Sequence, residues 1–128
     1  MSQPSHRDRL WAVRGAVQAA GNDEEAILGS TEELIHEILG RNVIDAGHVV
    51  SVIFTCTGDL NAQFPAVAAR RLGLDRVPLI CARELDVPEA MERVIRVLVH
   101  YYGANEHLPE HVYIGAAQSL RADLRSAQ

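Results

Sequence analysis

The feature that most constrains the fold is an imbalance, because the chain has one long helix-like segment and five strand-like segments. Residues 22–41 place apolar side chains at helical spacing, with Asn22 or Asp23 as the N-cap. The strand-like segments are rich in β-branched or alternating apolar residues and span 9–17, 48–56, 77–81, 91–102 and 111–120. A single long helix covers only one face of a sheet. We therefore expect an oligomer, in which another chain covers the second face.

Segment 91–102 fits two structures. Its length permits a helix, whereas its β-branched and aromatic residues favour a strand, and we predict a strand. A short helix is expected from Pro65 to Arg71, and Gly15 is expected to break the first strand. The predicted fold is an α/β (α+β) protein, with a mixed five-stranded sheet and one long helix on one face.

Composition and charge limit the classes of function. One domain accounts for residues 1–128, and we expect residues 1–8 to form a disordered tail. A net charge of −5 argues against nucleic acid or an anionic membrane as a partner, and no apolar run reaches the roughly 18 residues of a membrane span. The first residues lack the apolar region of a signal peptide, and Cys56 and Cys81 form no CxxC pair. We expect a cytoplasmic protein.

Four arginines on or beside the predicted elements are available for an anionic ligand: Arg14, Arg70, Arg96 and Arg121. Arg96 is the most informative, because it interrupts an apolar run, where an unpaired buried guanidinium is costly. Its planar fork suits a carboxylate. Two alternatives to ligand binding remain open for Arg96, namely a structural ion pair with a glutamate and an exposed position on an edge strand.

Another group of polar residues follows the strand predicted at 77–81. Glu84 is placed either to accept a hydrogen bond from a ligand hydroxyl or to lie in a solvated turn. Cys81 fits a small core residue, and no histidine is placed to suggest a cysteine–histidine nucleophile. Tyr113 offers a hydrogen-bond donor to an anion, but it fits an ordinary strand aromatic as well.

The histidines and glycines suggest no cofactor site. His107 and His111 are four residues apart, but Pro109 lies between them and disfavours a helical pair of metal ligands. The glycines form no phosphate-binding motif. The residues therefore predict no metal, and the pattern by itself reaches only an α/β protein with arginines available for an anion.

Five stretches give the chain a specific resemblance: VRGA (13–16), DLNAQFPAVAAR (59–70), PLICARELDV (78–87), IRVLV (95–99) and HVYIGAAQSLRADL (111–124). In this order and spacing they resemble the trimeric bacterial chorismate mutases of the Bacillus type, the non-helical family, over about residues 10–124. The resemblance implies a homotrimer that forms a pseudo-α/β-barrel, with active sites at the subunit interfaces. One departure is Val67, which stands where the family often has lysine and removes a cationic contact from the rim.

The reaction that the resemblance implies is the conversion of chorismate to prephenate in phenylalanine and tyrosine biosynthesis. It is an intramolecular Claisen rearrangement, so such an isomerase needs no cofactor, metal or covalent intermediate. Two other functions remain open, an enamine or imine deaminase of similar trimeric fold and a non-catalytic trimer that binds small carboxylates. The combination of Arg14, Glu84 and Arg96 favours chorismate.

By the same resemblance, four residues are assigned to catalysis. Arg96 would face the ether oxygen, where negative charge grows as the C–O bond breaks. Arg14 would bind a carboxylate and help to hold the compact conformer. Glu84, assisted by Cys81, would accept a hydrogen bond from the ring hydroxyl.

The remaining assignments from the resemblance concern substrate binding. Tyr113 would donate a hydrogen bond to the substrate carboxylate. Phe64 would form an apolar wall, and Arg70 would add positive charge at the rim. Leu120 and Arg121 would lie near the mouth of the site.

Overall fold

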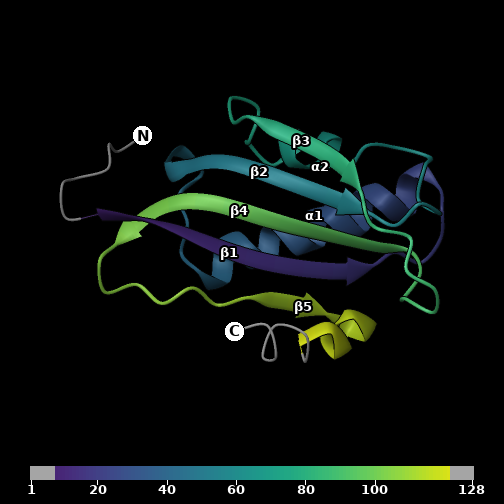
Figure 1. The fold of residues 1–128 in the computed structure, drawn as a ribbon. Helices are drawn as coiled ribbons and strands as arrows, with labels where there is room; N and C mark the ends of the chain where they lie inside the picture. Colours follow the sequence, from purple (N-terminus) through teal and green to yellow (C-terminus); the bar gives the residue numbers. More distant parts are fainter. Residues whose placement is uncertain (1–7, 122–128) are drawn as a thin grey trace.

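The computed structural model describes residues 8–121 and contains one five-stranded sheet with two helices (Figure 1). The strands are β1 (Asp8–Gln18), β2 (Val49–Cys56), β3 (Leu79–Arg83), β4 (Val94–Ala104) and β5 (Val112–Ile114). The helices are α1 (Glu24–Arg41) and α2 (Ala66–Arg71), and two short 3₁₀ helices are η1 (Ala46–His48) and η2 (Gly115–Leu120). Within these residues no helix has the length and apolar character needed to cross a membrane.

The strand β4 forms the centre of the sheet, whose strand order is β3-β2-β4-β1-β5. It pairs antiparallel with all eleven residues of β1 on one edge and with β2 on the other. The outer pairs, β1–β5 and β2–β3, are parallel, so the sheet is mixed, as predicted. The strand interpretation of segment 91–102 is therefore confirmed, since β-branched residues suit a central strand that packs on both faces.

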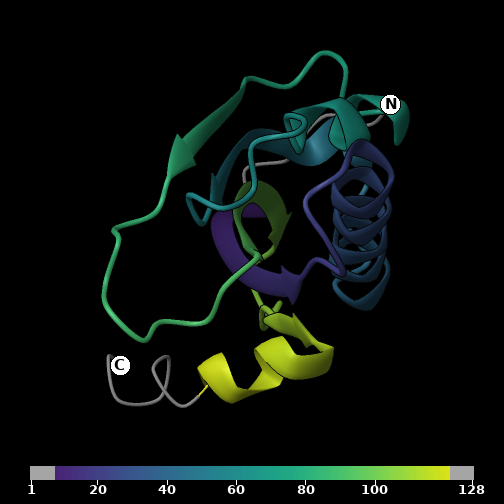
Figure 2. The same ribbon diagram turned by 90° about the vertical axis from the view of Figure 1, so that its right-hand side faces the viewer.

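Both helices lie on the same face of the sheet, as Figures 1 and 2 show. Helix α1 begins after Asp23, whose carboxylate accepts a 2.8 Å hydrogen bond from the backbone N–H of Ala26. The main core fills the space between α1 and the sheet and includes apolar side chains from both: Val13, Ile27, Leu34, Ile35, Ile38, Phe54, Ile95, Val97 and Val99. Each such side chain contributes roughly 1.5–3 kcal/mol to folding through burial.

The opposite face of the sheet carries neither α1 nor α2 (Figure 2). Among the described residues, a small apolar cluster of Ala16, Val94, Tyr113 and Ala117 packs at the end of this face beside η2. The segment between β3 and β4 projects from the sheet on the side away from α1 (Figure 2), and its Leu85 is 87% exposed. One long helix on one face of a five-stranded sheet is thus the arrangement that the sequence predicted.

Several predicted boundaries are wrong, and β4 begins at Val94 and not at residue 91. Strand β3 begins at Leu79, later than expected, because Pro78 has no N–H for the ladder, although its carbonyl still accepts from Val52. Strand β5 spans only three residues, because Gly115 (φ 59°) turns the chain into η2. Asp8 belongs to β1 and not to a tail, and the rest of the predicted tail lies outside the described residues.

Gly15 lies inside β1 and does not break it, contrary to the prediction. Helix α1 and β5 pack directly against this residue. A Cβ here would lie 2.8 Å from Cδ1 of Ile38 and 2.8 Å from the carbonyl oxygen of Val112. The glycine therefore permits the close approach of three elements and does not form a turn.

Gly15→Ala should destabilise the protein by roughly 1–3 kcal/mol, since the Val112 carbonyl cannot move aside without disturbing the β1–β5 pairing. Gly29→Ala is the matched control, because a Cβ at this helical position meets nothing within 4 Å. It should stabilise the protein by roughly 0.5–1 kcal/mol. Urea unfolding of both variants measures the difference, and equal stabilities would contradict the packing argument.

Candidate active site

A pocket of about 220 Å³ opens on the helix-free face of the sheet. It is lined by Arg14 of β1, Arg96 of β4, Tyr113 of β5 and Thr55 of β2. The strand registers bring these positions together, since Arg96 pairs with Thr55 on one side and with Ala16 on the other. Ala16 in turn pairs with Tyr113. Residues opposite one another in a sheet point to the same face, so the polar side chains gather in one place.

Glu84 joins this group from the segment after β3. Its Oε2 atom accepts a 2.6 Å hydrogen bond from the Thr55 hydroxyl and lies 2.8 Å from Nε of Arg96. The buried N–H of Nε is not directed at that oxygen, so the contact is electrostatic and not a hydrogen bond. The arginine–glutamate ion pair considered from the sequence is therefore present, between side chains that are 31% and 19% exposed.

This ion pair involves Nε of Arg96 and leaves the rest of the guanidinium available to a ligand. Its two terminal amino groups, the Arg14 guanidinium and the Tyr113 hydroxyl make no hydrogen bond to any residue of the range 8–121. The Oε1 atom of Glu84 has no hydrogen-bond partner in that range either. The pocket thus offers two cations and a phenol donor, with a carboxylate acceptor beside them. These groups suit a ligand that carries two carboxylates and a hydroxyl.

Two other predicted residues border a different hollow, of about 520 Å³, at the ends of β2 and β3. Phe64 is 68% exposed, and Cys81 is also exposed. Neither residue lines the pocket of Arg14 and Arg96. The core position that the sequence suggested for Cys81 is therefore wrong for this chain.

The remaining predicted residues lie elsewhere. Arg70 is exposed on α2, on the helix-covered face, and Val67 is half-buried on the same helix. Leu120 packs against the small cluster beside η2. Arg121 borders a charged hollow of about 280 Å³ that also reaches Tyr113. One copy of the chain therefore assembles only part of the predicted set.

Sequence reasoning missed Thr55. The signal was available, because alternation along 48–56 places Thr55 on the face opposite the buried Phe54. The hydrogen-bond partner of Thr55, which is Glu84, could not be predicted from this alternation. Glu84 reaches Thr55 because the chain stays beside β2 after β3 ends, with the Glu84 N–H donating to the Cys56 carbonyl at 2.9 Å.

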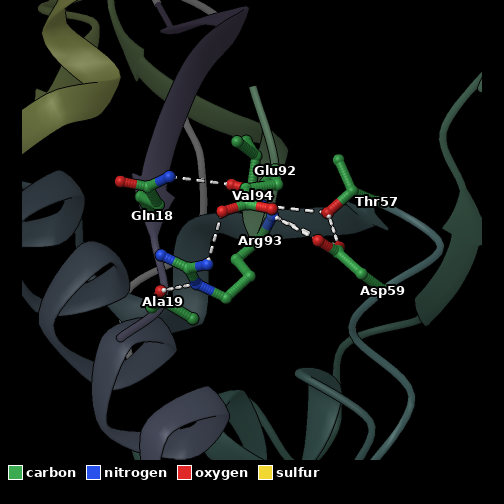
Figure 3. A network of polar contacts seen from close by, with 7 residues as sticks. All are labelled: Gln18, Ala19, Thr57, Asp59, Glu92, Arg93 and Val94. Carbon is green, nitrogen blue, oxygen red and sulfur yellow. Dashed lines mark hydrogen bonds and ion pairs between the residues drawn. The ribbon is translucent and has the colours of Figure 1, made fainter. Parts of the chain in front are cut away.

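A polar network fixes the start of β4, just before Arg96 (Figure 3). Asp59 accepts hydrogen bonds from the backbone N–H of Arg93 at 3.0 and 3.2 Å and from the Thr57 hydroxyl at 2.5 Å. The Thr57 bond is the main reason that the pKa of Asp59 is lowered. Arg93 has a left-handed backbone (φ 52°), and its Nε donates to the Ala19 carbonyl at 3.0 Å. The network ties together the ends of β1, β2 and β4.

The two histidines weighed as metal ligands have other partners. Nε2 of His107 lies 2.7 Å from the Tyr101 hydroxyl, and its ring packs edge-on against Trp11. His111 accepts a hydrogen bond through Nδ1 from the backbone N–H of Arg14. Throughout the described part of the chain, no group of three or more His, Cys, Asp or Glu side chains is placed to hold a metal ion.

Comparison with known proteins identifies the family. The family model described as chorismate mutase type I matches residues 10–124. The chain belongs to this family. Chorismate mutase AroH of Thermus thermophilus is 45% identical over 121 residues, which cover 91% of this chain and 97% of the relative. Chorismate mutase AroH of Bacillus subtilis is 35% identical over 120 residues, which cover 90% and 92%.

The structural comparison agrees. A solved chorismate mutase from Clostridium thermocellum is 37% identical in sequence and matches the fold with a TM-score of 0.81, over 85% of this chain and 98% of that one. The resemblance drawn from the five sequence stretches is therefore confirmed, together with the mixed sheet and its single long helix.

The two cysteines of this chorismate mutase family member should react differently with iodoacetamide near pH 8. Burial raises the pKa of Cys56 to about 12, so its reactive thiolate is nearly absent, whereas Cys81 is exposed. Mass spectrometry should find an adduct on Cys81 alone, and none in Cys81→Ser. Unfolding in guanidinium should let Cys56 react as well. An adduct on Cys56 in the folded protein would contradict this assignment of burial.

Proposed function

We propose that the pocket on the helix-free face binds chorismate and rearranges it to prephenate. Membership of the type I chorismate mutase family over residues 10–124 supports the reaction. The assignment of the pocket rests mainly on the state of the Arg96 guanidinium. Its terminal amino groups stay unbonded in a pocket that Arg14 shares, while its Nε lies against Glu84.

The chemistry of the reaction explains why a fixed cation is needed. An ether C–O bond breaks while a C–C bond forms in the same molecule, so no proton or electron enters or leaves. Negative charge grows on the ether oxygen, and a cation there stabilises the transition state more than the ground state. Arg96 is the proposed cation, because its contact with Glu84 holds the side chain before the substrate arrives. The reaction then requires no cofactor.

The other pocket residues are proposed to hold the substrate in its reactive shape. Arg14 and Tyr113 would bind the carboxylates, since both present unbonded donors to the pocket. The unbonded Oε1 of Glu84 would accept from the ring hydroxyl, while Thr55 keeps the carboxylate in place. Cys81, near Glu84 in sequence, would support that contact. Holding a flexible ether in one conformer reduces the entropic part of the barrier.

We also infer that a neighbouring protomer completes each site in a homotrimer. Arg70 and Phe64 share no pocket with Arg96 within one chain. Apolar residues are exposed near the helix-free face, among them Ile80 at 59% and Leu85 at 87%. If the α2 side of one chain met the open face of the next, these residues would be covered and Arg70 would approach Arg96. Such an arrangement would give the pseudo-α/β-barrel that the sequence suggested.

Two further parts of the proposal concern the surroundings of the site. Leu120 and Arg121 would lie at its mouth, since the end of η2 packs beside Tyr113. The enzyme would act in the cytoplasm, in the biosynthesis of phenylalanine and tyrosine. The two cysteines are free thiols, which supports a reducing compartment.

Arg96→Ala should lower kcat by roughly 10²–10³-fold with a smaller rise in KM, because the contact strengthens in the transition state. The assay follows the loss of chorismate absorbance with no added cofactor. Arg96→Lys should recover only part of the rate, since a flexible point charge replaces a planar fork. Arg14→Ala should show a larger share of its loss in KM. A near-normal kcat in Arg96→Ala, with assembly unchanged, would contradict the mechanism. Arg96 would then serve only to neutralise Glu84.

The shared sites can be tested by mixing two variants. Arg96→Ala and Arg70→Ala should each be impaired alone. Refolded together, they should recover up to about a quarter of wild-type activity, because some interfaces then combine an intact Arg96 from one chain with an intact Arg70 from the next. Light scattering should find trimers in every sample. Mixed trimers that recover nothing would contradict a site built from two chains.

A further inference from the structure

His111 makes a hydrogen bond to the backbone of a proposed substrate-binding residue. Its Nδ1 accepts from the backbone N–H of Arg14 at 3.0 Å, between residues 97 positions apart in sequence. The ladder between β1 and β5 covers only Gly15–Val17 and Val112–Ile114. The imidazole thus extends this short ladder by one bond, to the residue whose guanidinium lines the pocket.

This bond determines the protonation state of the ring. A backbone N–H can only donate, so Nδ1 must be the acceptor and the proton of the neutral ring must lie on Nε2. A second proton would sit on Nδ1 and point at the Arg14 N–H. The hydrogen bond would then be replaced by two opposed donors, and an unsatisfied donor at a half-buried site is destabilising. Protonated His111 is therefore incompatible with the observed position of Arg14.

His111 borders a hollow that charged side chains line. The ionisable groups that contact His111 or line this hollow with it are Arg14 on β1, Glu33, Glu37 and Arg41 on α1, Glu110 before β5, and Arg121 after η2. Burial, followed by the charges of Arg14 and Arg121, lowers the pKa of His111 below its ordinary value of 6.5. The ring is therefore neutral at neutral pH and becomes protonated only in acid.

We propose that His111 is a positioning residue, which holds Arg14 for substrate binding and releases it when the imidazole is protonated. This proposal rests on the proposed function of the pocket. Tyr113 lies on β5 two residues after His111, and it is expected to move with this residue. Because Arg14 binds a carboxylate that is present before and during the reaction, its displacement weakens binding more than it slows the chemical step.

The reaction itself makes this effect easy to isolate. The rearrangement transfers no proton, and ordinary carboxylates remain ionised above about pH 5. A rise in KM between about pH 5 and 6.5 must therefore come from the protein. Such a rise comes either from His111, through its bond to Arg14, or from another group of the pocket.

Three proteins separate these possibilities: the wild type, His111→Asn and His111→Phe. The Asn Oδ1 can replace Nδ1 as acceptor but does not titrate, whereas Phe keeps a planar ring and removes the acceptor. In the wild type, KM should rise as the pH falls below 6.5. In His111→Asn it should stay flat over that range. In His111→Phe it should be raised roughly tenfold at every pH, with a smaller change in kcat.

A measurement on the unliganded wild type keeps the proposal testable if a variant folds poorly. Nitrogen NMR of the His111 imidazole should show Nε2 protonated and Nδ1 unprotonated near pH 7. The amide resonance of Arg14 should titrate with the same midpoint as His111. An Arg14 amide that does not follow His111, or a His111→Asn protein that keeps the acid rise in KM, would overturn the proposal. A wild type that never consumes chorismate would refute the proposed function instead, and the Arg14 amide would still decide the coupling.

Discussion

The pairing of β4 along both of its edges is the constraint on which the rest of the structure depends. Because β1 and β2 fix its register, Ile95 and every second residue after it face α1, whereas Val94 and Arg96 face the open side. A slip by one residue would press Arg96 into the core and expose Ile95. The same register therefore sets the stability of the core and the chemistry of the pocket, and the hydrogen bonds around Arg93 hold it at one end (Figure 3).

Local sequence predicted those elements for which propensity and long-range pairing agree. Helix α1 was predictable from its apolar spacing and the Asp23 cap, and β2 and β4 from their β-branched residues. The bounds of β3 and β5 were not, although Pro78 and Gly115 mark one end of each, because the apolar pattern of these short outer strands continues past the residues that pair. Gly15 was misjudged for a related reason. A glycine within a strand can be required because another element packs closely against it. The local sequence pattern does not show which distant element this is.

The same distinction applies to the candidate site. Once the register is known, counting along the strands is enough to place Arg14, Arg96 and Tyr113 on one face. The contacts of Glu84 with Thr55 and of His111 with Arg14 join residues 29 and 97 positions apart, so no local pattern contains them. The ion pair and the proposed catalytic role of Arg96 looked like alternatives in the sequence. In the structure they are compatible, because the pair uses Nε and leaves the terminal amino groups for a ligand.

The sheet topology also has a consequence for how the protein is made. Strand β1 leaves the ribosome first, but its partners in the sheet are β4 and β5. While residues 42–93 are being synthesised, β1 and α1 carry apolar faces that have no β4 to pack against. Contacts of such long sequence separation slow folding and lengthen the time for which apolar surface is exposed. The sheet can therefore be completed only after β5 (Val112–Ile114) has left the ribosome, and until then the apolar faces of β1 and α1 favour aggregation.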